Sequence, residues 1–129
     1  MSQQLALTTL LVDDYDRAIA WYTTVLGFEL RADTALGAGK RWVVVAPVGS
    51  QAGLVLTLAS TVNQQSRIGD QTGGRVGFFL HTDDFARDHA AMTARGVRFT
   101  AAPRQEPHGT VAIFTDLYGN TWDLLEPAP

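Results

Sequence analysis

The sequence predicts an α+β protein built from two βαβββ modules, whose strands form an incompletely closed, barrel-like sheet around a cleft. The stretch 12–28 has the pattern of a strand end, a helix, a glycine and a new strand, and the stretch 80–99 repeats this order. Each contains an Asp-Asp-aromatic sequence, and the two lie 83 − 13 = 70 residues apart. Such a repeat indicates two copies of one supersecondary unit. A helix covers only one sheet face, so two units side by side leave a ligand-binding concave face.

The length of 129 residues fits one compact domain, because domains of about 100–150 residues are common. We expect residues 1–129 to form a single domain. Module one is predicted at about 5–59, a linker at 60–74 and module two at about 75–127. The hydrophobic content of 46% is sufficient for a sizeable core.

Composition excludes several classes of protein. The net charge is −3 and the sequence has no basic run, which argues against a nucleic-acid partner. No apolar stretch is long enough to span a membrane, and the first residues lack the charged and apolar regions of a signal peptide. With no cysteine, disulfides and thiolate chemistry are excluded. We therefore expect a cytoplasmic protein with no membrane partner.

Module one is expected to hold a helix and four strands. Asp13 or Asp14 can cap the helix, and an apolar stripe starting at Tyr15 continues to about Leu26, before Gly27. A flexible glycine-rich turn is expected over 35–40. The expected strands are 5–12, 28–31, 41–46 and 54–58.

Module two is expected to repeat this order after the polar, glycine-containing linker. A helix is predicted over 85–95, a loop over 103–109 and a turn over 117–120. The expected strands are 76–81, 97–100, 111–115 and 121–125.

Two motifs resemble those of the vicinal oxygen chelate superfamily, which includes glyoxalase I, bleomycin-resistance proteins and extradiol dioxygenases. The stretch 12–28 is similar to its "V-x-D-x-x-x-A-x-x-F-Y…L-G-F" signature, with Trp21 in place of Phe. The stretch 115–126 is similar to its "D-P-x-G-N-x-x-E-L" ending, with Leu117 for Pro and Asp123 for Glu. The resemblance covers about residues 5–127 and implies the fold, a small-molecule ligand and a homodimer. The superfamily hosts many chemistries, so the activity does not follow from it.

The resemblance also implies where a metal would bind. Metal-using members place one ligand near the start of the first strand and one in the last strand of each module. Carried over to this sequence, these positions are Leu7, Leu56, Gly77 and Asp123. Only Asp123 can bind a cation, whereas a divalent metal needs three or four converging N or O ligands. We therefore expect no metal and no other cofactor.

Strand alternation predicts which residues line the cleft. Most are apolar, Gly77 is expected to leave room at the centre, and Trp42 and Trp122 are either stacking faces or core residues under the helices. The residues predicted to bind ligand are Leu7, Thr9, Trp42, Leu56, Gly77, Phe79, His108, Thr121 and Asp123. Leu54, Leu58 and Leu125 are placed on the same face.

Asp123 is the candidate catalytic residue. A carboxylate that faces an apolar cleft is costly unless paired, and burial raises its pKa. It could serve as a general base or anchor a cationic or hydroxyl-bearing ligand. Alternatively, it pairs with an arginine such as Arg41, or lies in water near a strand end.

Two loop residues near the cleft mouth remain open to both readings. His108 is either a ligand or acid–base group, or a solvated turn residue. Arg104 either gates the cleft for an anionic ligand or is solvated at the surface.

Two functions are consistent with these residues, and we predict the first. The first is a metal-independent binding protein that sequesters a largely apolar or aromatic molecule. The second is an enzyme, either a glyoxalase-like lyase or isomerase or a dioxygenase-like protein, with Asp123 as general base or metal ligand.

Overall fold

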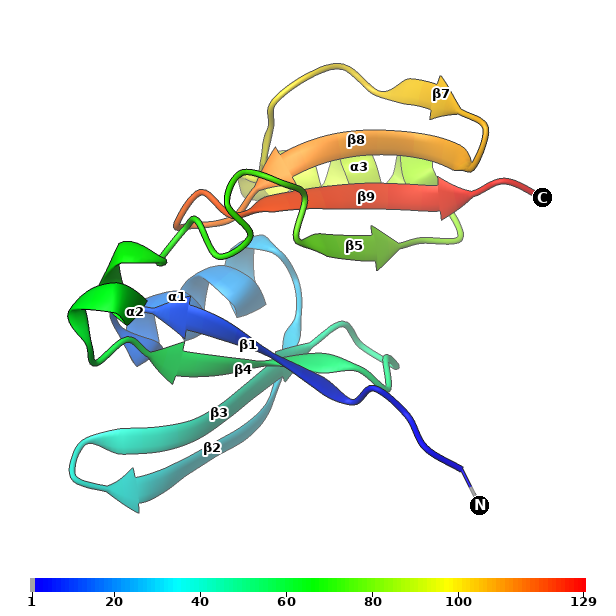
Figure 1. Ribbon diagram of the computed structural model, residues 1–129. Helices are drawn as coiled ribbons and strands as arrows, with labels where there is room; N and C mark the ends of the chain where they lie inside the picture. The colour runs from blue at the N-terminus through cyan, green and yellow to red at the C-terminus, as the bar shows by residue number, and fades with distance from the viewer. Residues whose placement is uncertain (1) are drawn as a thin grey trace. The chain divides into compact units, whose positions relative to one another are not determined.

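The computed structural model describes residues 2–129, which form two compact units, one ending at Ile68 and the other running from Gly69 to Pro129 (Figure 1). Each unit contains its own open β-sheet, of four strands in the first and five in the second. Neither sheet closes on itself within the described residues. The predicted α+β class, built from two modules without a closed barrel, is confirmed.

Unit one has the strand order β1-β4-β3-β2. Strand β1 runs parallel to β4, and the other pairs are antiparallel. Its elements are β1 (Leu7–Val12), α1 (Tyr15–Ala20), the π-helix η1 (Trp21–Val25), β2 (Glu29–Gly37), β3 (Lys40–Ala46), β4 (Gly53–Leu58) and α2 (Val62–Ser66).

Unit two has the strand order β5-β9-β8-β6, with β7 also pairing with β8. Strand β5 runs parallel to β9, as β1 does to β4. Its elements are β5 (Phe78–His81), α3 (Phe85–Arg95), β6 (Arg98–Phe99), β7 (Arg104–Glu106), β8 (Gly109–Thr115) and β9 (Thr121–Pro127).

Three segments differ from the prediction. The expected flexible turn at 35–40 is largely strand, because β2 extends to Gly37 and pairs with β3 through two register shifts. The expected loop at 103–109 contains β7, which forms a hairpin with β8. The expected linker contains α2, which Thr61 and Gln64 begin with a reciprocal capping box.

The two module helices begin in the same way. The Asp14 carboxylate accepts a hydrogen bond from the Arg17 backbone N–H at 2.9 Å, and Asp84 accepts one from the Arg87 N–H at 3.1 Å. Asp13 and Asp83, one residue earlier, form i,i+4 ion pairs with these arginines. The paired aspartates are therefore helix caps, as predicted.

The two helices end differently. Helix α3 stops at Gly96, whose φ of +103° is left-handed, and the Val97 N–H bonds to the Met92 carbonyl. After α1 the chain continues as the π-helix η1, and the left-handed glycine is Gly27. The interval from Asp14 to Gly27 is therefore one residue longer than the interval from Asp84 to Gly96. The π turn accommodates the extra residue. The prediction of one uniform helix to about residue 26 did not include this turn.

The core of unit one lies between its sheet and α1. Tyr15 and Ala18 of α1 and Tyr22 of η1 are buried and pack on this side. The sheet residues that share this face are at most 5% exposed; they are Leu10, Val12, Val43, Val45, Leu54 and Leu56.

The core of unit two is built from stacked aromatic rings. Trp122 stacks on Phe78 at 4.7 Å and on Phe114 at 5.6 Å between ring centroids, and it is 4% exposed. Phe114 also contacts Phe99, whose ring lies 4.2 Å from that of His89 of α3. Trp122 is therefore a core residue, which decides between its two predicted roles.

The sequence motif before β9 builds a turn. The Asp116 carboxylate accepts hydrogen bonds from the backbone N–H groups of Tyr118 and Asn120, and from the Asn120 side chain. Asp116 and Asn120 are both buried, at 6% and 5% exposed. This motif fixes the start of β9 and hence the position of Asp123 two residues further on.

Candidate functional site

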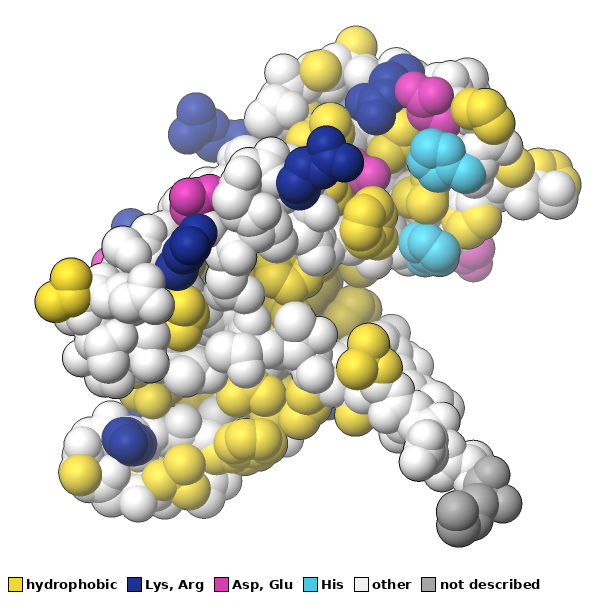
Figure 2. Space-filling view, viewed as in Figure 1, with side chains coloured by type: hydrophobic (Ala, Val, Ile, Leu, Met, Phe, Trp, Pro, Cys, Tyr) yellow, Lys and Arg dark blue, Asp and Glu magenta, His cyan; other side chains and the backbone are white. Residues whose placement is uncertain are grey.

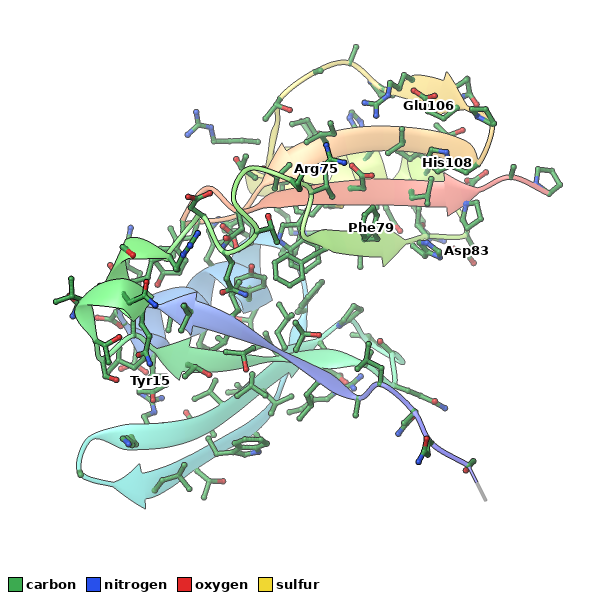
Figure 3. All side chains as sticks on the ribbon, in the orientation of Figure 1. Tyr15, Arg75, Phe79, Asp83, Glu106 and His108 are labelled. Carbon is green, nitrogen blue, oxygen red and sulfur yellow. The ribbon has the colours of Figure 1, made fainter. Side chains whose placement is uncertain are left out.

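The face of the unit two sheet opposite α3, here called the helix-free face, carries the candidate polar site. Asp123 lies at the centre of β9, between Phe79 of β5 and Ile113 of β8 in register. Residues opposite one another on paired strands project from the same face. Figure 3 shows Phe79, Glu106 and His108 on the side of the sheet towards the viewer, with α3 behind the strands.

The Asp123 side chain is enclosed. The residue is 7% exposed, and its Oδ1 atom is buried with no hydrogen-bond partner among residues 2–129. Burial without a partner disfavours the charged form, and the pKa of this carboxyl is raised above its ordinary value. Asp123 is thus a polar group held in an apolar position, a feature common at functional sites.

Two positive groups oppose this effect of burial. The charges of Arg104 and His108 both lower the Asp123 pKa, although less than burial raises it. Arg104 is held by Glu106, whose Oε1 lies 2.7 Å from the arginine Nε. The β7–β8 hairpin therefore brings its charged side chains to the helix-free face, and Glu106 had not been predicted. Figure 2 shows arginine and histidine side chains around apolar ones in this region of unit two.

Two alternatives for Asp123 are wrong. Arg41 does not pair with it, because the Arg41 guanidinium binds Asp16 at 3.0 Å and Asp33 at 2.7 Å within unit one. Asp123 also does not lie in water at a strand end, because β9 continues to Pro127 and the residue is buried.

The remaining predicted residues of unit two are arranged as follows. Thr121 is on β9 two residues before Asp123, and so shares its face. His108 is in the turn between β7 and β8, is exposed, and its carbonyl accepts a hydrogen bond from the Ala128 N–H. Phe79 is 62% exposed on the helix-free face.

The expectation that Gly77 leaves free space is wrong. Its backbone N–H bonds to the Thr121 carbonyl, which continues the ladder beyond β5. A Cβ atom built at Gly77 would lie 2.8 Å from the Thr72 Cγ2. The room above this glycine is therefore filled by the Thr72 side chain, which belongs to the expected linker.

The helix-free face of unit one, which is the face of its sheet opposite α1, is more apolar than that of unit two. Leu7 is 38% exposed and Trp42 is 42% exposed. Thr9 pairs with Val55, which pairs in turn with Val44, two residues from Trp42. Trp42 is therefore on the uncovered face rather than in the core, which supports its role as a stacking face.

Leu56, predicted to line the cleft, lies in the core instead. It pairs with Leu10 and with Val43 on the face that α1 covers, and it is 0% exposed. Leu54 and Leu58 are each two residues from Leu56 on the same strand, so they also lie on the covered face. Leu7 lies on the opposite face. The predicted superposition of the last strands was shifted by one residue.

The pairing registers give the corrected equivalence. Phe79 pairs with Asp123 in unit two, and Thr9, the residue 70 positions before Phe79, pairs with Val55 in unit one. Val55 is therefore the counterpart of Asp123. Sequence alternation could not detect this, because 54–58 is apolar at every position except Thr57.

With this correction, the four metal positions implied by the resemblance are Leu7, Val55, Gly77 and Asp123. They supply one carboxylate and no imidazole, which does not fit a divalent metal with three or four ligands. Within residues 2–129, no three His, Asp or Glu side chains are grouped so that they could hold a metal ion.

The fold and these motifs define the class of protein. Residues 4–124 match the family described as Glyoxalase/Bleomycin resistance protein/Dioxygenase superfamily, and the chain belongs to it. No helix within residues 2–129 is both long and apolar enough to cross a membrane.

Several relatives align along nearly their whole length. An uncharacterised protein of Shewanella frigidimarina (strain NCIMB 400) is 48% identical, over 98% of this chain and 95% of that protein. TnmS3, an antibiotic binding protein from Streptomyces sp. CB03234, is 32% identical with a TM-score of 0.80, over 98% of both chains. A superfamily member from Sphaerobacter thermophilus DSM 20745 is 33% identical with a TM-score of 0.78, over 97% of this chain and 98% of that one.

Proposed function

We propose that this protein is a metal-independent small-molecule binding protein, which sequesters a largely apolar or aromatic ligand. The observation that carries the proposal is the full-length similarity to TnmS3, whose stated role is antibiotic binding. The donor set supports metal independence, because Asp123 is the one metal-binding side chain at the four family positions.

The side chains on the helix-free faces support an aromatic ligand. Trp42 and Phe79 each present a partly exposed ring on a sheet face that no helix covers in its own unit. Aromatic rings add stacking energy to the burial of apolar area. In unit one, Leu7 adds apolar surface and Thr9 adds a polar group. In unit two, Thr121, His108 and Asp123 supply the few polar groups that orient a ligand.

The proposal includes a homodimer located in the cytoplasm. Size-exclusion chromatography with light scattering tests the dimer, and twice the chain mass is expected. A monomer at micromolar concentration would contradict it.

The first test combines metal analysis of the purified protein with titration of divalent metal ions. The purified protein is analysed for metal and then titrated with Zn²⁺, Ni²⁺, Mn²⁺ and Fe²⁺ under thermal-shift readout. We expect no stoichiometric metal and no shift. A stoichiometric metal that stabilises the protein would overturn metal independence.

The second test measures binding directly. The protein, treated with EDTA, is titrated with metal-free bleomycin and with the neutral aromatic dye N-phenylnaphthylamine, and fluorescence is recorded. We expect saturable binding of at least one of them, weakened by Phe79→Ala but not by Trp21→Phe. Absence of saturable binding by both would contradict an aromatic-binding site.

An enzyme is the second candidate, and the buried carboxyl of Asp123 is the observation that favours it. A general base needs a pKa nearer to neutrality than that of an exposed aspartate, and burial moves this pKa in that direction. Asp123→Asn separates the two functions, because it would abolish base catalysis while apolar binding persisted. Glyoxalase-type turnover that Asp123→Asn removes would replace the binding proposal.

A further inference from the structure

We propose that Asp123 Oδ1 accepts a hydrogen bond from the bound molecule, so the ligand class is an aromatic compound that carries an O–H or N–H donor beside its ring. This inference rests on the proposed binding function and specifies its ligand chemistry.

The Asp123 Oδ1 atom is the first observation. A buried carboxylate oxygen without a partner loses its hydration and receives nothing in return. Asp123 is 93% buried, since 7% of it is exposed, and no donor of residues 2–129 reaches Oδ1. Its neighbours in register, Phe79 and Ile113, are apolar. A donor supplied by a ligand would satisfy this atom.

Phe79 is the second observation. A phenylalanine that is 62% exposed leaves a large apolar area in water. It occupies the strand position beside Asp123, and neighbouring strands are about 4.8 Å apart. A ring stacked on Phe79 would therefore lie beside the strand position of Asp123, and its substituent would meet the enclosed Oδ1 when the side chains that cover this atom move aside.

The surrounding charges favour an acceptor role for Asp123. Arg104 and His108 both act on this carboxyl and favour its ionised form, which can only accept hydrogen bonds. His81 shares the face on β5, Glu106 on β7 is paired with Arg104, and Arg75 precedes β5 on the viewer's side in Figure 3. Burial outweighs these charges and raises the pKa of the carboxyl, but its ionised form can only accept, so the group that pairs with Oδ1 in that form is a donor, either neutral or cationic.

The experiment compares three ligands that share one ring system. Naphthol carries a neutral O–H donor, methoxynaphthalene is its methyl ether without a donor, and naphthylmethylamine carries a cationic N–H donor. Dissociation constants are measured by calorimetry at neutral pH on the metal-free protein and on Asp123→Leu, which keeps the branched side-chain skeleton and has no acceptor. Thr115→Val, on the neighbouring strand β8 and the same face, is the matched control.

We expect the wild type to bind at least one donor-bearing ligand about tenfold more tightly than the ether, as a hydrogen bond to a charged acceptor provides. A preference for naphthol identifies a neutral donor, and a preference for the amine identifies a cation. Asp123→Leu should reduce the ratio to about one by weakening the donor ligand while keeping the ether, and Thr115→Val should keep the ratio.

Three results would overturn the inference, and they are distinguishable. Equal binding of all three ligands by the wild type would leave the binding function intact and remove the role of Asp123. Absence of binding by all three would overturn the aromatic ligand itself, and with it the proposed function. A ratio that persists in Asp123→Leu would assign the acceptor to another residue. Thermal melting of each variant verifies that it is folded.

Discussion

The two units share one scaffold and differ on the face that their helix does not cover. Leu10, Leu56 and Val43 are neighbours on the helix side of unit one, and Leu80, Leu124 and Ala112 take the same places in unit two. On the helix-free side, the positions of Thr9 and Val55 in unit one correspond to those of Phe79 and Asp123 in unit two. The repeat therefore maintains apolar packing against the helix, while the opposite face varies in chemistry.

This difference assigns separate tasks to the two faces. Burial against a helix requires apolar side chains and tolerates little else, so both units use them. The helix-free face is released from that requirement and can hold an exposed tryptophan in one unit and a buried carboxyl in the other. Candidate ligand groups are expected there, and Leu56 is excluded from them.

The largest effect should come from the helix side. Leu56→Ala is expected to lower the free energy of unfolding by about 2–5 kcal/mol, because it opens a cavity at a fully buried position. The neighbouring Val55→Ala, on the other face, should cost clearly less. Urea denaturation of both variants measures the difference. Equal losses would mean that the two faces are not distinguished as described.

The next largest difference in stability is expected between variants in the turns that precede the last strand of each module. Asp116→Ala removes the acceptor for three hydrogen bonds at a buried turn and is expected to cost about 2–3 kcal/mol. In unit one, Ser50 makes an exposed hydrogen bond to the Ala52 carbonyl, and Ser50→Ala should cost less than about 0.5 kcal/mol. Thermal melting compares the two, and a similar cost at Ser50 would contradict the account.

Asp123→Leu should stabilise the protein. The substitution replaces a buried carboxyl without a partner for Oδ1 by an apolar side chain with the same branched skeleton, and a gain of about 1–2 kcal/mol is expected. The reverse exchange at its counterpart, Val55→Asp, should destabilise unit one. A loss of stability in Asp123→Leu, measured in urea, would show that the carboxyl serves the fold.

The pH dependence of stability should also contain a contribution from the Asp123 carboxyl. The pKa of Asp123 is raised in the folded state, so the folded protein holds this proton more tightly than the unfolded chain. Its contribution is therefore greatest at acid pH, below the ordinary pKa, and falls as pH rises through the raised pKa. Asp33 and Asp88 have lowered pKa values and act in the opposite direction.

A difference measurement isolates Asp123 from those groups. The free energy of unfolding of Asp123→Asn minus that of the wild type should increase with pH above about 4 and then level off. Urea titrations at several pH values measure this difference. A difference that decreases with pH would mean that the carboxylate is stabilised in the folded protein.

The smallest loss of stability is expected on removal of the helix caps, and it should be the same in both units. Asp14→Ala and Asp84→Ala each remove one helix cap at an exposed helix start, and each is expected to cost about 1 kcal/mol. Circular dichroism in urea compares them. A much larger cost at one site would show that the two helix starts are not equivalent.

The sequence predicted the repeated parts of this molecule best. The Asp-Asp-aromatic motif located both helix starts, and the bounds of the second helix, 85–95, agree with α3. The π turn was missed because the buried residues Tyr15, Ala18, Tyr22 and Leu26 follow ordinary α-helical spacing. Strand β7 was missed because Pro103 and Pro107 flank a short polar segment that forms a strand only by pairing with β8.

The candidate site was predicted in part, for a physical reason. Asp123 stands out in sequence as a charge within an apolar strand, and Phe79 follows from its alternation with Leu80. The position of Leu56 could not be resolved, since the face of a uniformly apolar strand depends on its pairing register. Neither the packing of Thr72 over Gly77 nor the ion pair between Arg104 and Glu106 has a local sequence signal.

The central claim is that the helix-free face of unit two binds the ligand without a metal. We would test it by a ¹⁵N–¹H NMR titration of metal-free, isotope-labelled protein with naphthol. The account predicts the largest shifts at Phe79, Thr121 and Asp123, and small ones at His89 and Met92 of α3, on the opposite side. Shifts centred on α3, or shifts that appear only after a divalent metal is added, would contradict it.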